Sequence, residues 1–119
     1  MVLVDTSVWI DHLRSGNAHL AQLLEDGDAA IHPFIIGELA CGNLNNRKEI
    51  ISLLHALPHL DKADDDEILF FIEKHKLMGL GIGLIDIHLL ASCKLGKTKL
   101  LTKDKRLAMA AGKLNLLFE

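Results

Sequence analysis

The chain has 119 residues, of which 50% are hydrophobic and 24% are charged, and its formal net charge at pH 7 is −3. High hydrophobicity with a small net charge excludes intrinsic disorder, and the length suits one domain with its own core. The chain is mildly acidic and therefore lacks the excess of basic residues that is typical of nucleic-acid-binding proteins. We therefore expect a single domain over residues 1–119.

Short apolar runs alternate with amphipathic segments along the chain. In chain order we predict a strand at Val2–Val4, helices at Ser7–Leu13 and His19–Glu25, a strand at Ala29–His32, helices at Pro33–Cys41, Arg47–Leu57 and Asp64–Lys76, a mobile glycine-rich loop at 79–83, a helix at Asp86–Leu95, a strand at Lys99–Thr102, a helix at Asp104–Ala111 and a last strand at Asn115–Phe118. Strands that alternate with helices indicate an α/β fold with helices on both faces of a parallel sheet.

Nothing in the sequence indicates membrane insertion or export. No uncharged run is long enough to span a bilayer, since Ala29–Gly37 has nine residues and Ile50–Leu60 has eleven, and the N-terminus lacks the basic region of a signal peptide. Cys41 and Cys93 show no metal-site spacing, so we expect both to be small buried hydrophobes in a reducing compartment. These features predict a cytoplasmic protein without a membrane partner.

Four carboxylates stand where acidic residues are unexpected. Asp5 and Asp104 each follow a predicted strand, at the sheet edge where open parallel sheets place their active sites. Glu38 and Asp86 lie on apolar helix stripes that carry no lysine or arginine. Burying such charges is costly and bringing them together is repulsive, so a divalent cation is the simplest compensation. Oxygen ligands suit Mg²⁺ or Mn²⁺, in one or two ions.

Each carboxylate also has a purely structural interpretation. Asp5, Asp86 and Asp104 all stand at positions where a side chain caps a helix N-terminus. Glu38 is in mid-helix, so capping does not explain it. Sequence spacing alone does not show that the four side chains meet.

Other chemistries fit less well. A haloacid-dehalogenase-like phosphatase needs a second aspartate two residues after the first, where this chain has Ser7. The run Gly79–Gly83 does not follow a strand, as a dinucleotide-binding loop does. A non-catalytic α/β binding module remains an alternative, with nuclease assays after Mg²⁺ titration as the discriminating test.

The remaining histidine and aromatic candidates have structural interpretations. We expect three histidines to be structural or solvent-facing, namely His32, His75 and His88. We expect three aromatic residues to belong to the core, namely Trp9, Phe70 and Phe71.

Basic residues gather near the end of the chain. Six cations fall within thirteen residues, namely Lys94, Lys97, Lys99, Lys103, Lys105 and Arg106. They form either an ordinary solvated surface or a rim that binds the phosphates of RNA. Arg14, after the first predicted helix, is a further candidate for this rim.

The order of the acidic motifs resembles that of the PIN-domain ribonucleases. The matching segments are 5–11 (DTSVWID), 37–39 (GEL), 83–92 (GLIDIHLLAS) and 101–107 (LTKDKRL). Together they extend over essentially the whole chain, and its compact size is similar to that of the VapC toxins of toxin–antitoxin pairs.

This resemblance implies a three-layer α/β/α PIN-like domain with a central, mainly parallel sheet. It implies an Mg²⁺- or Mn²⁺-dependent endoribonuclease that uses activated water, leaves a 5′-phosphate and a 3′-hydroxyl, and inhibits translation and growth. It also implies a homodimer and a hetero-oligomer with a VapB-like antitoxin that neutralises the toxin.

The resemblance assigns roles to particular residues. Asp5, Glu38, Asp86 and Asp104 are the implied catalytic, metal-binding acids, with Thr6, Ser7 and Thr102 supporting them by hydrogen bonds, and Arg14, Lys103, Lys105 and Arg106 binding RNA. One departure is that Lys105, Arg106 and Leu107 stand where some family members carry a further acid. That acid belongs to the position of a second metal ion. For partner surfaces we consider Leu20, Leu23, Leu24 and the Arg47–Leu57 helix, with ordinary core packing as the alternative.

Overall fold

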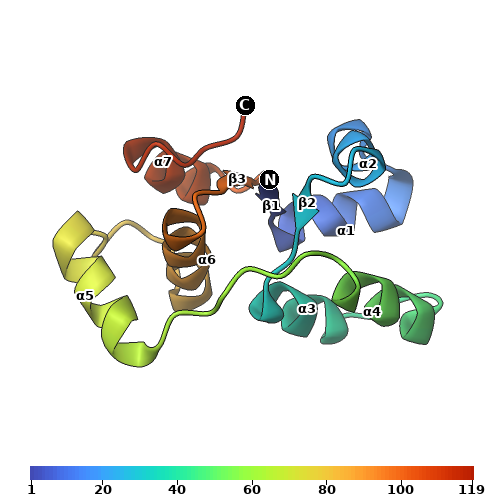
Figure 1. Cartoon of the computed structure of the whole chain (residues 1–119), viewed down its shortest axis with the longest axis horizontal. Coiled ribbons are helices and arrows are strands. Elements are labelled where there is room, and N and C mark those ends of the chain that lie inside the picture. Colours follow the sequence, from blue (N-terminus) through green and yellow to red (C-terminus); the bar gives the residue numbers. More distant parts are fainter.

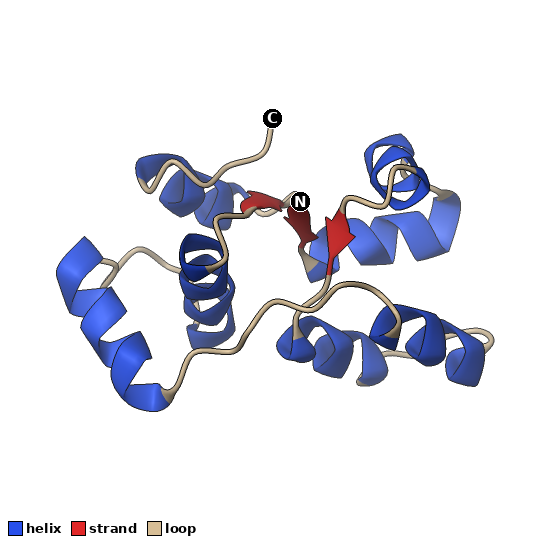
Figure 2. Cartoon of the chain, in the orientation of Figure 1, coloured by secondary structure: helices blue, strands red, loops and turns tan.

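The computed structural model describes residues 1–119 and is built around a three-stranded parallel sheet. The strands are β1 (Val2–Val4), β2 (Ala29–Ala30) and β3 (Lys99–Leu101), in the order β2-β1-β3. Val4 is in register with Leu101, so β1 and β3 end side by side. Figure 2 shows the three strands at the centre of the molecule with helices around them.

Seven helices surround this sheet. They are α1 (Thr6–Ser15), α2 (Ala18–Glu25), α3 (Pro33–Ala40), α4 (Arg47–His55), α5 (Asp65–His75), α6 (Leu84–Leu95) and α7 (Lys105–Lys113). Helices α1 to α4 gather on the β2 side and α5 to α7 on the β3 side (Figure 1). The predicted α/β/α class with a parallel sheet is confirmed. No helix is long and apolar enough to cross a membrane.

The core runs through the sheet into α6. All three residues of β1 are buried, as expected for a strand covered on both faces. Seven consecutive residues of α6, Ile87–Cys93, are also buried, because α5 and β3 both pack against this helix. The site residues at the ends of β1 and α6 are therefore held by the best-packed part of the chain.

Several predicted element boundaries are wrong. The last strand, Asn115–Phe118, is reduced to one bridge between Leu100 and Leu117, because only the backbone of Leu100 pairs with it. β2 stops at Ala30 since His32 already caps α3, its ring accepting a hydrogen bond from the Phe34 N–H. Helix α6 begins two residues before Asp86, at Leu84.

Some burial predictions also need correction. Cys93 is buried, but Cys41 is exposed because α3 ends at Ala40, one residue before it. Phe70 is 67% exposed, since Phe71 takes the inward-facing position on α5. Leu20 and Leu23 are buried core residues, so the alternative of ordinary core packing holds for them.

Candidate metal centre at the carboxyl ends of the strands

The candidate site forms where β1 and β3 end. The sheet order β2-β1-β3 means that the chain leaves β1 towards β2 and later returns to the opposite side of β1. The crevice at such a switch point is where open α/β sheets bind ligands. Asp5 stands directly in it, and its N–H donates to the carbonyl of Leu101 at 2.9 Å.

The Asp5 carboxylate is buried and held by two hydroxyl groups. The residue is only 6% exposed, and its Oδ2 accepts hydrogen bonds from Ser7 Oγ (2.8 Å) and Thr102 Oγ1 (2.7 Å). Asp5 occupies the N-cap position of α1 but makes no side-chain capping bond, so capping does not explain it. Its Oδ1 accepts no hydrogen bond from the protein, which leaves that oxygen available to a ligand.

Glu38 reaches the same region from α3. Its half-buried side chain accepts a 2.6 Å hydrogen bond on Oε1 from Thr6 Oγ1, at the first residue of α1. Helices α1 and α3 pack together, so this bond crosses a helix–helix contact. Thr6 thus orients Glu38 as Ser7 and Thr102 orient Asp5.

Asp86 and Asp104 combine a structural contact with a position near the site. Asp86 Oδ2 accepts the Gly83 N–H (3.2 Å) at the start of α6, and Asp104 Oδ1 accepts the Leu107 N–H (2.9 Å) as the N-cap of α7. The capping interpretation therefore holds for Asp104 and in part for Asp86. Each carboxylate keeps a second oxygen that accepts no hydrogen bond from the protein.

The four carboxylates act on one another electrostatically. Burial raises the pKa of Asp86, the Gly83 N–H opposes that rise, and the charges of Asp5, Asp104 and Glu38 add to it. No lysine or arginine forms an ion pair with any of the four, because the molecule's single salt bridge joins Lys103 to Asp11. No group of three or more acidic, histidine or cysteine side chains is placed to hold a metal ion together. The site thus gathers negative charge without compensation from the protein.

The Lys103–Asp11 pair is a feature that sequence reasoning missed. Lys103 Nζ lies 3.3 Å from Asp11 Oδ1, and Asn17 Nδ2 donates to Asp11 Oδ2 at 2.8 Å. The Asn17 hydrogen bond, and then Lys103, lower the pKa of Asp11. Asp11 ends the first acidic motif, but only the tertiary structure shows that it binds the loop after β3.

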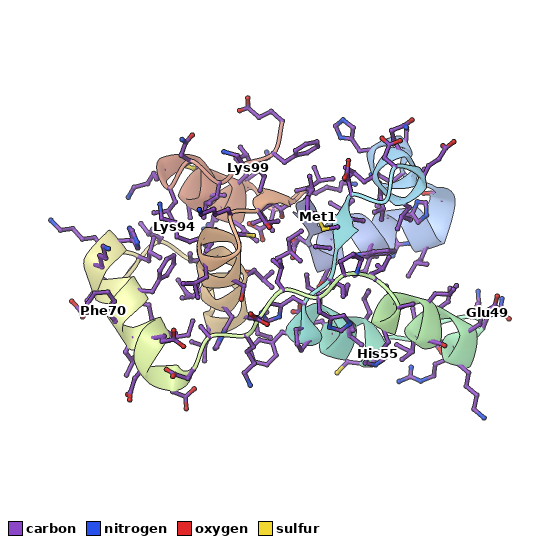
Figure 3. The ribbon with its side chains drawn as sticks, viewed as in Figure 1. Met1, Glu49, His55, Phe70, Lys94 and Lys99 are labelled. Atoms are coloured by element: carbon purple, nitrogen blue, oxygen red, sulfur yellow. The ribbon has the colours of Figure 1, made fainter.

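The predicted basic rim is divided by the fold. Lys103, Lys105 and Arg106 lie at the site end of β3 and the start of α7, whereas Lys94, Lys97 and Lys99 lie at the opposite end of the sheet. Lys99 begins β3 and Lys103 follows its end, while Lys94 lies in the last turn of α6 and Asp86 in its first turn. Lys99 Nζ donates to the Asn115 carbonyl, and Lys94 and Lys99 are labelled in Figure 3. A continuous rim of six cations around the site is therefore wrong.

A groove of about 510 Å³ adjoins the site between α1, α3 and the loop that joins α3 to α4. Glu38 and Arg14 both line it, together with the exposed side chains of Ile10 and Leu13. Arg14 thus lines this groove, and its charge also lowers the pKa of Asp11, the partner of Lys103. A molecule bound in the groove would contact Glu38.

The fold and this arrangement of acids define a class of protein. A sequence profile of the PIN domain matches residues 2–113, and the chain belongs to the PIN-domain family. It is 44% identical to Ribonuclease VapC32 of Mycobacterium tuberculosis over 111 residues, which is 92% of this chain and 90% of that protein.

Solved structures share the fold at lower identity. A toxin–antitoxin complex from Klebsiella pneumoniae aligns with a TM-score of 0.68 at 23% identity, covering 91% of each chain. FitAcB from Neisseria gonorrhoeae aligns with a TM-score of 0.66 at 22% identity, covering 94% of each chain. The resemblance to PIN domains that the four motifs indicate is confirmed.

Proposed function

We propose that this protein is a metal-dependent endoribonuclease and a VapC-like toxin. The observation that carries the proposal is the buried Asp5 carboxylate, which two hydroxyls orient at the switch point and no cation neutralises. The 44% identity to a ribonuclease over nearly the whole chain supports RNA as the substrate. PIN ribonucleases generally depend on a divalent metal.

The donor set fits a hard divalent cation. The side chains that these hydrogen bonds join at the ends of the strands offer carboxylate and hydroxyl oxygens, and the carboxylates lack a cationic partner. Asp5, Glu38, Asp86 and Asp104 would hold one or two ions, with Mg²⁺ or Mn²⁺ as the expected species. Thr6, Ser7 and Thr102 support this set as hydrogen-bond donors to Glu38 and Asp5.

A bound divalent cation lowers the pKa of a water ligand and offsets charge on the phosphodiester. The residues of the chain provide orientation, because Ser7 and Thr102 leave Asp5 with one carboxylate oxygen free for binding. Lys103, Lys105 and Arg106 at the same edge attract the phosphates of RNA. We expect cleavage by water to leave a 5′-phosphate and a 3′-hydroxyl, so the ribose 2′-hydroxyl is not the nucleophile.

The direct test is RNA cleavage with Mg²⁺, Mn²⁺ or EDTA. We expect activity with the metals, none with EDTA, and a loss of at least about 100-fold in Asp5→Asn and Asp86→Asn. Asp65→Asn, an exposed aspartate on α5, is the matched control and should keep full activity. Cleavage that resists EDTA would contradict the metal mechanism. Metal binding without cleavage would favour the alternative, a non-catalytic α/β module.

We further propose that a VapB-like antitoxin binds the groove beside α1 and α3. An apolar segment would cover Ile10 and Leu13 and would restrict access to Glu38. Where a short gene adjoins the gene for this chain, its product is the candidate partner. It should inhibit cleavage by the wild-type chain but not by Leu13→Glu, whereas the exposed α4 change Leu53→Glu should leave inhibition intact. Equal inhibition of both variants would place the antitoxin elsewhere. The proposed RNA substrate and the proposed antitoxin partner are both consistent with a protein that acts in the cytoplasm.

A homodimer is best supported by the outer face of α5. Asp66, Phe70 and Lys74 follow one another at a spacing of four residues and line a cavity of about 480 Å³ with Leu95 of α6. Phe70 and Leu95 are 67% and 62% exposed, and Phe70 is labelled in Figure 3. A twofold axis at Phe70 would place Asp66 of each copy opposite Lys74 of the other, so the face is complementary to itself. Helix α4, considered from the sequence, offers Leu53 but no such charge pattern.

A further inference from the structure

We propose that Gly81 forms the seat of Arg106 and holds its guanidinium in place to bind a substrate phosphate beside the acidic site. This inference rests on the proposed function, because it assigns a substrate contact to a ribonuclease. Gly81 has no side chain with which to bind a phosphate itself. It therefore acts as a positioning residue for Arg106.

The first observation is the close approach of Arg106 to the backbone of Gly81. A Cβ atom built on Gly81 would lie 2.6 Å from Arg106 Nη1 and 2.9 Å from its Cδ. Distances below 3.0 Å are not tolerated by a real Cβ, so an alanine at this position requires the arginine to move. The backbone φ of Gly81 is +76°, in the left-handed region that favours glycine.

The second observation is the way in which the loop presents this surface. Leu80 and Ile82 pack against the hydrophobic core, while Gly79, Gly81 and Gly83 are exposed. The alternation leaves bare backbone on the outer side of an anchored loop. The end of the Arg106 side chain packs against this bare backbone at Gly81. The loop, predicted from its glycines to be mobile, is held to the core by Leu80 and Ile82.

The third observation is where the seated guanidinium lies. Arg106 belongs to the first turn of α7, two residues after Asp104, and it reaches the loop whose Gly83 N–H binds Asp86. Its side chain therefore connects the two segments that carry these acids. It forms no hydrogen bond and no ion pair within the protein, so all five of its N–H donors are free.

These features fit a phosphate group better than a structural role. A guanidinium can bind a phosphate through two parallel hydrogen bonds, which needs a defined orientation of its plane. Packing on Gly81 restricts that orientation before RNA arrives. The phosphate bound by Arg106 would lie next to the scissile phosphate in the RNA chain, and the scissile phosphate itself would bind at the acidic site.

The loop provides a matched control for the experiment. Gly79 has nearly the same conformation, with φ +71°, but nothing lies within 4 Å of a Cβ built there. Gly79→Ala and Gly81→Ala therefore impose similar backbone strain, and only the second displaces Arg106. Any difference in RNA binding between the two variants therefore measures the effect of the contact between Gly81 and Arg106.

The test measures binding of a single-stranded RNA oligonucleotide in EDTA at several salt concentrations, and cleavage of the same RNA with Mg²⁺. We expect Arg106→Ala to weaken binding about tenfold and to reduce the slope of log affinity against log salt by about 0.7. Gly81→Ala should change both values in the same direction but by less, because the displaced arginine keeps its charge. Gly79→Ala should behave as wild type, and Gly81→Ala/Arg106→Ala should be no weaker than Arg106→Ala. Arg106→Lys should restore the slope but only part of the affinity.

Two results would overturn the inference. One is an unchanged salt slope in Arg106→Ala, and the other is equal binding by Gly79→Ala and Gly81→Ala. Failure of the proposed function looks different, since the wild-type chain would then neither bind nor cleave RNA. Cleavage by wild type but not by Asp5→Asn, with normal binding by the Arg106 variants, rejects the seat alone.

Discussion

Thr102 and Asp5 are 97 residues apart in the sequence, yet Thr102 Oγ1 donates a 2.7 Å hydrogen bond to Asp5 Oδ2. The bond joins the ends of two neighbouring parallel strands, because Val4 and Leu101 are in register. Thr102 Oγ1 also accepts the Asp104 N–H at 3.0 Å. One hydroxyl thereby links two of the four candidate metal ligands.

Replacing Thr102 tests this link. We expect Thr102→Val to lower RNA cleavage by about 10- to 100-fold, since it removes an outer-shell partner of a proposed metal ligand. The free energy of unfolding should fall by about 1 to 2 kcal/mol in urea titrations. Thr102→Ser keeps the hydroxyl and should retain most activity.

Thr98 provides the control for this prediction. It lies before the other end of β3, where its buried hydroxyl donates to the Gly96 carbonyl. Thr98→Val should lower stability without lowering cleavage by the folded protein. Equal loss of activity in both valine variants would mean that the Thr102 effect is structural.

The Thr6–Glu38 bond predicts a second supporting residue. Removing the hydroxyl in Thr6→Val leaves Glu38 without its 2.6 Å donor, so cleavage should fall by about tenfold and more Mg²⁺ should be needed for half-maximal activity. Thr6→Ser should restore both values. An unchanged Mg²⁺ requirement in Thr6→Val would argue against Glu38 as a ligand.

Stability should depend on pH through His32. The ring is fully buried, its Nδ1 accepts the Phe34 N–H, and Nε2 lies 3.1 Å from Ser92 Oγ, which donates to the Asp61 carbonyl. Burial, together with the charges of His88, Lys62 and His59, lowers the pKa of His32 from 6.5 to about 4.

Because the unfolded chain binds the proton more tightly, this contribution to stability is complete above pH 6.5 and is lost as the pH falls towards 4. Urea titrations at pH 7.0 and 4.5 should show a lower free energy of unfolding at the acidic pH. The drop should be smaller in His32→Asn, which keeps an N-cap side chain. An equal drop in both proteins would assign the pH dependence to other groups.

Lys103 and Lys105 should contribute differently to RNA binding. Lys103 is engaged with Asp11, whereas Lys105 is exposed and forms no ion pair. Lys105→Gln should therefore reduce the salt slope of RNA binding by about 0.7, and Lys103→Gln by less. In an Asp11→Asn background the two changes should become similar. Identical slopes in the wild-type background would show that the Asp11 pair opens on binding.

Charge reversal on α5 tests the proposed dimer. Asp66→Lys should shift the chain towards monomer in sedimentation equilibrium, because it places like charges across the twofold axis. The double change Asp66→Lys/Lys74→Asp restores complementarity and should restore the dimer. Phe70→Ser should also favour the monomer. A wild-type chain that sediments as a monomer would refute the dimer, and failure of the double change to rescue would refute this face.

The sequence alone predicts much of this protein for a simple reason. Strand, helix and capping signals are local, so all three strands of the sheet and all seven helices are predicted within a few residues. The order of the four acidic motifs also suffices for the family. The sequence does not predict how far strand pairing extends at the edge of the sheet, where the end of the chain pairs with Leu100 alone.

The sequence by itself therefore determined the fold class, the family and the list of candidate acids, because these depend on residue types and their order. Only the tertiary structure decided what each acid contacts. It separates Asp5, which caps nothing, from Asp104, which does cap its helix. It also divides six neighbouring cations between opposite ends of the sheet and sets Arg106 on Gly81. The physical reason is that contacts between distant residues depend on strand register and helix packing, which no local pattern records.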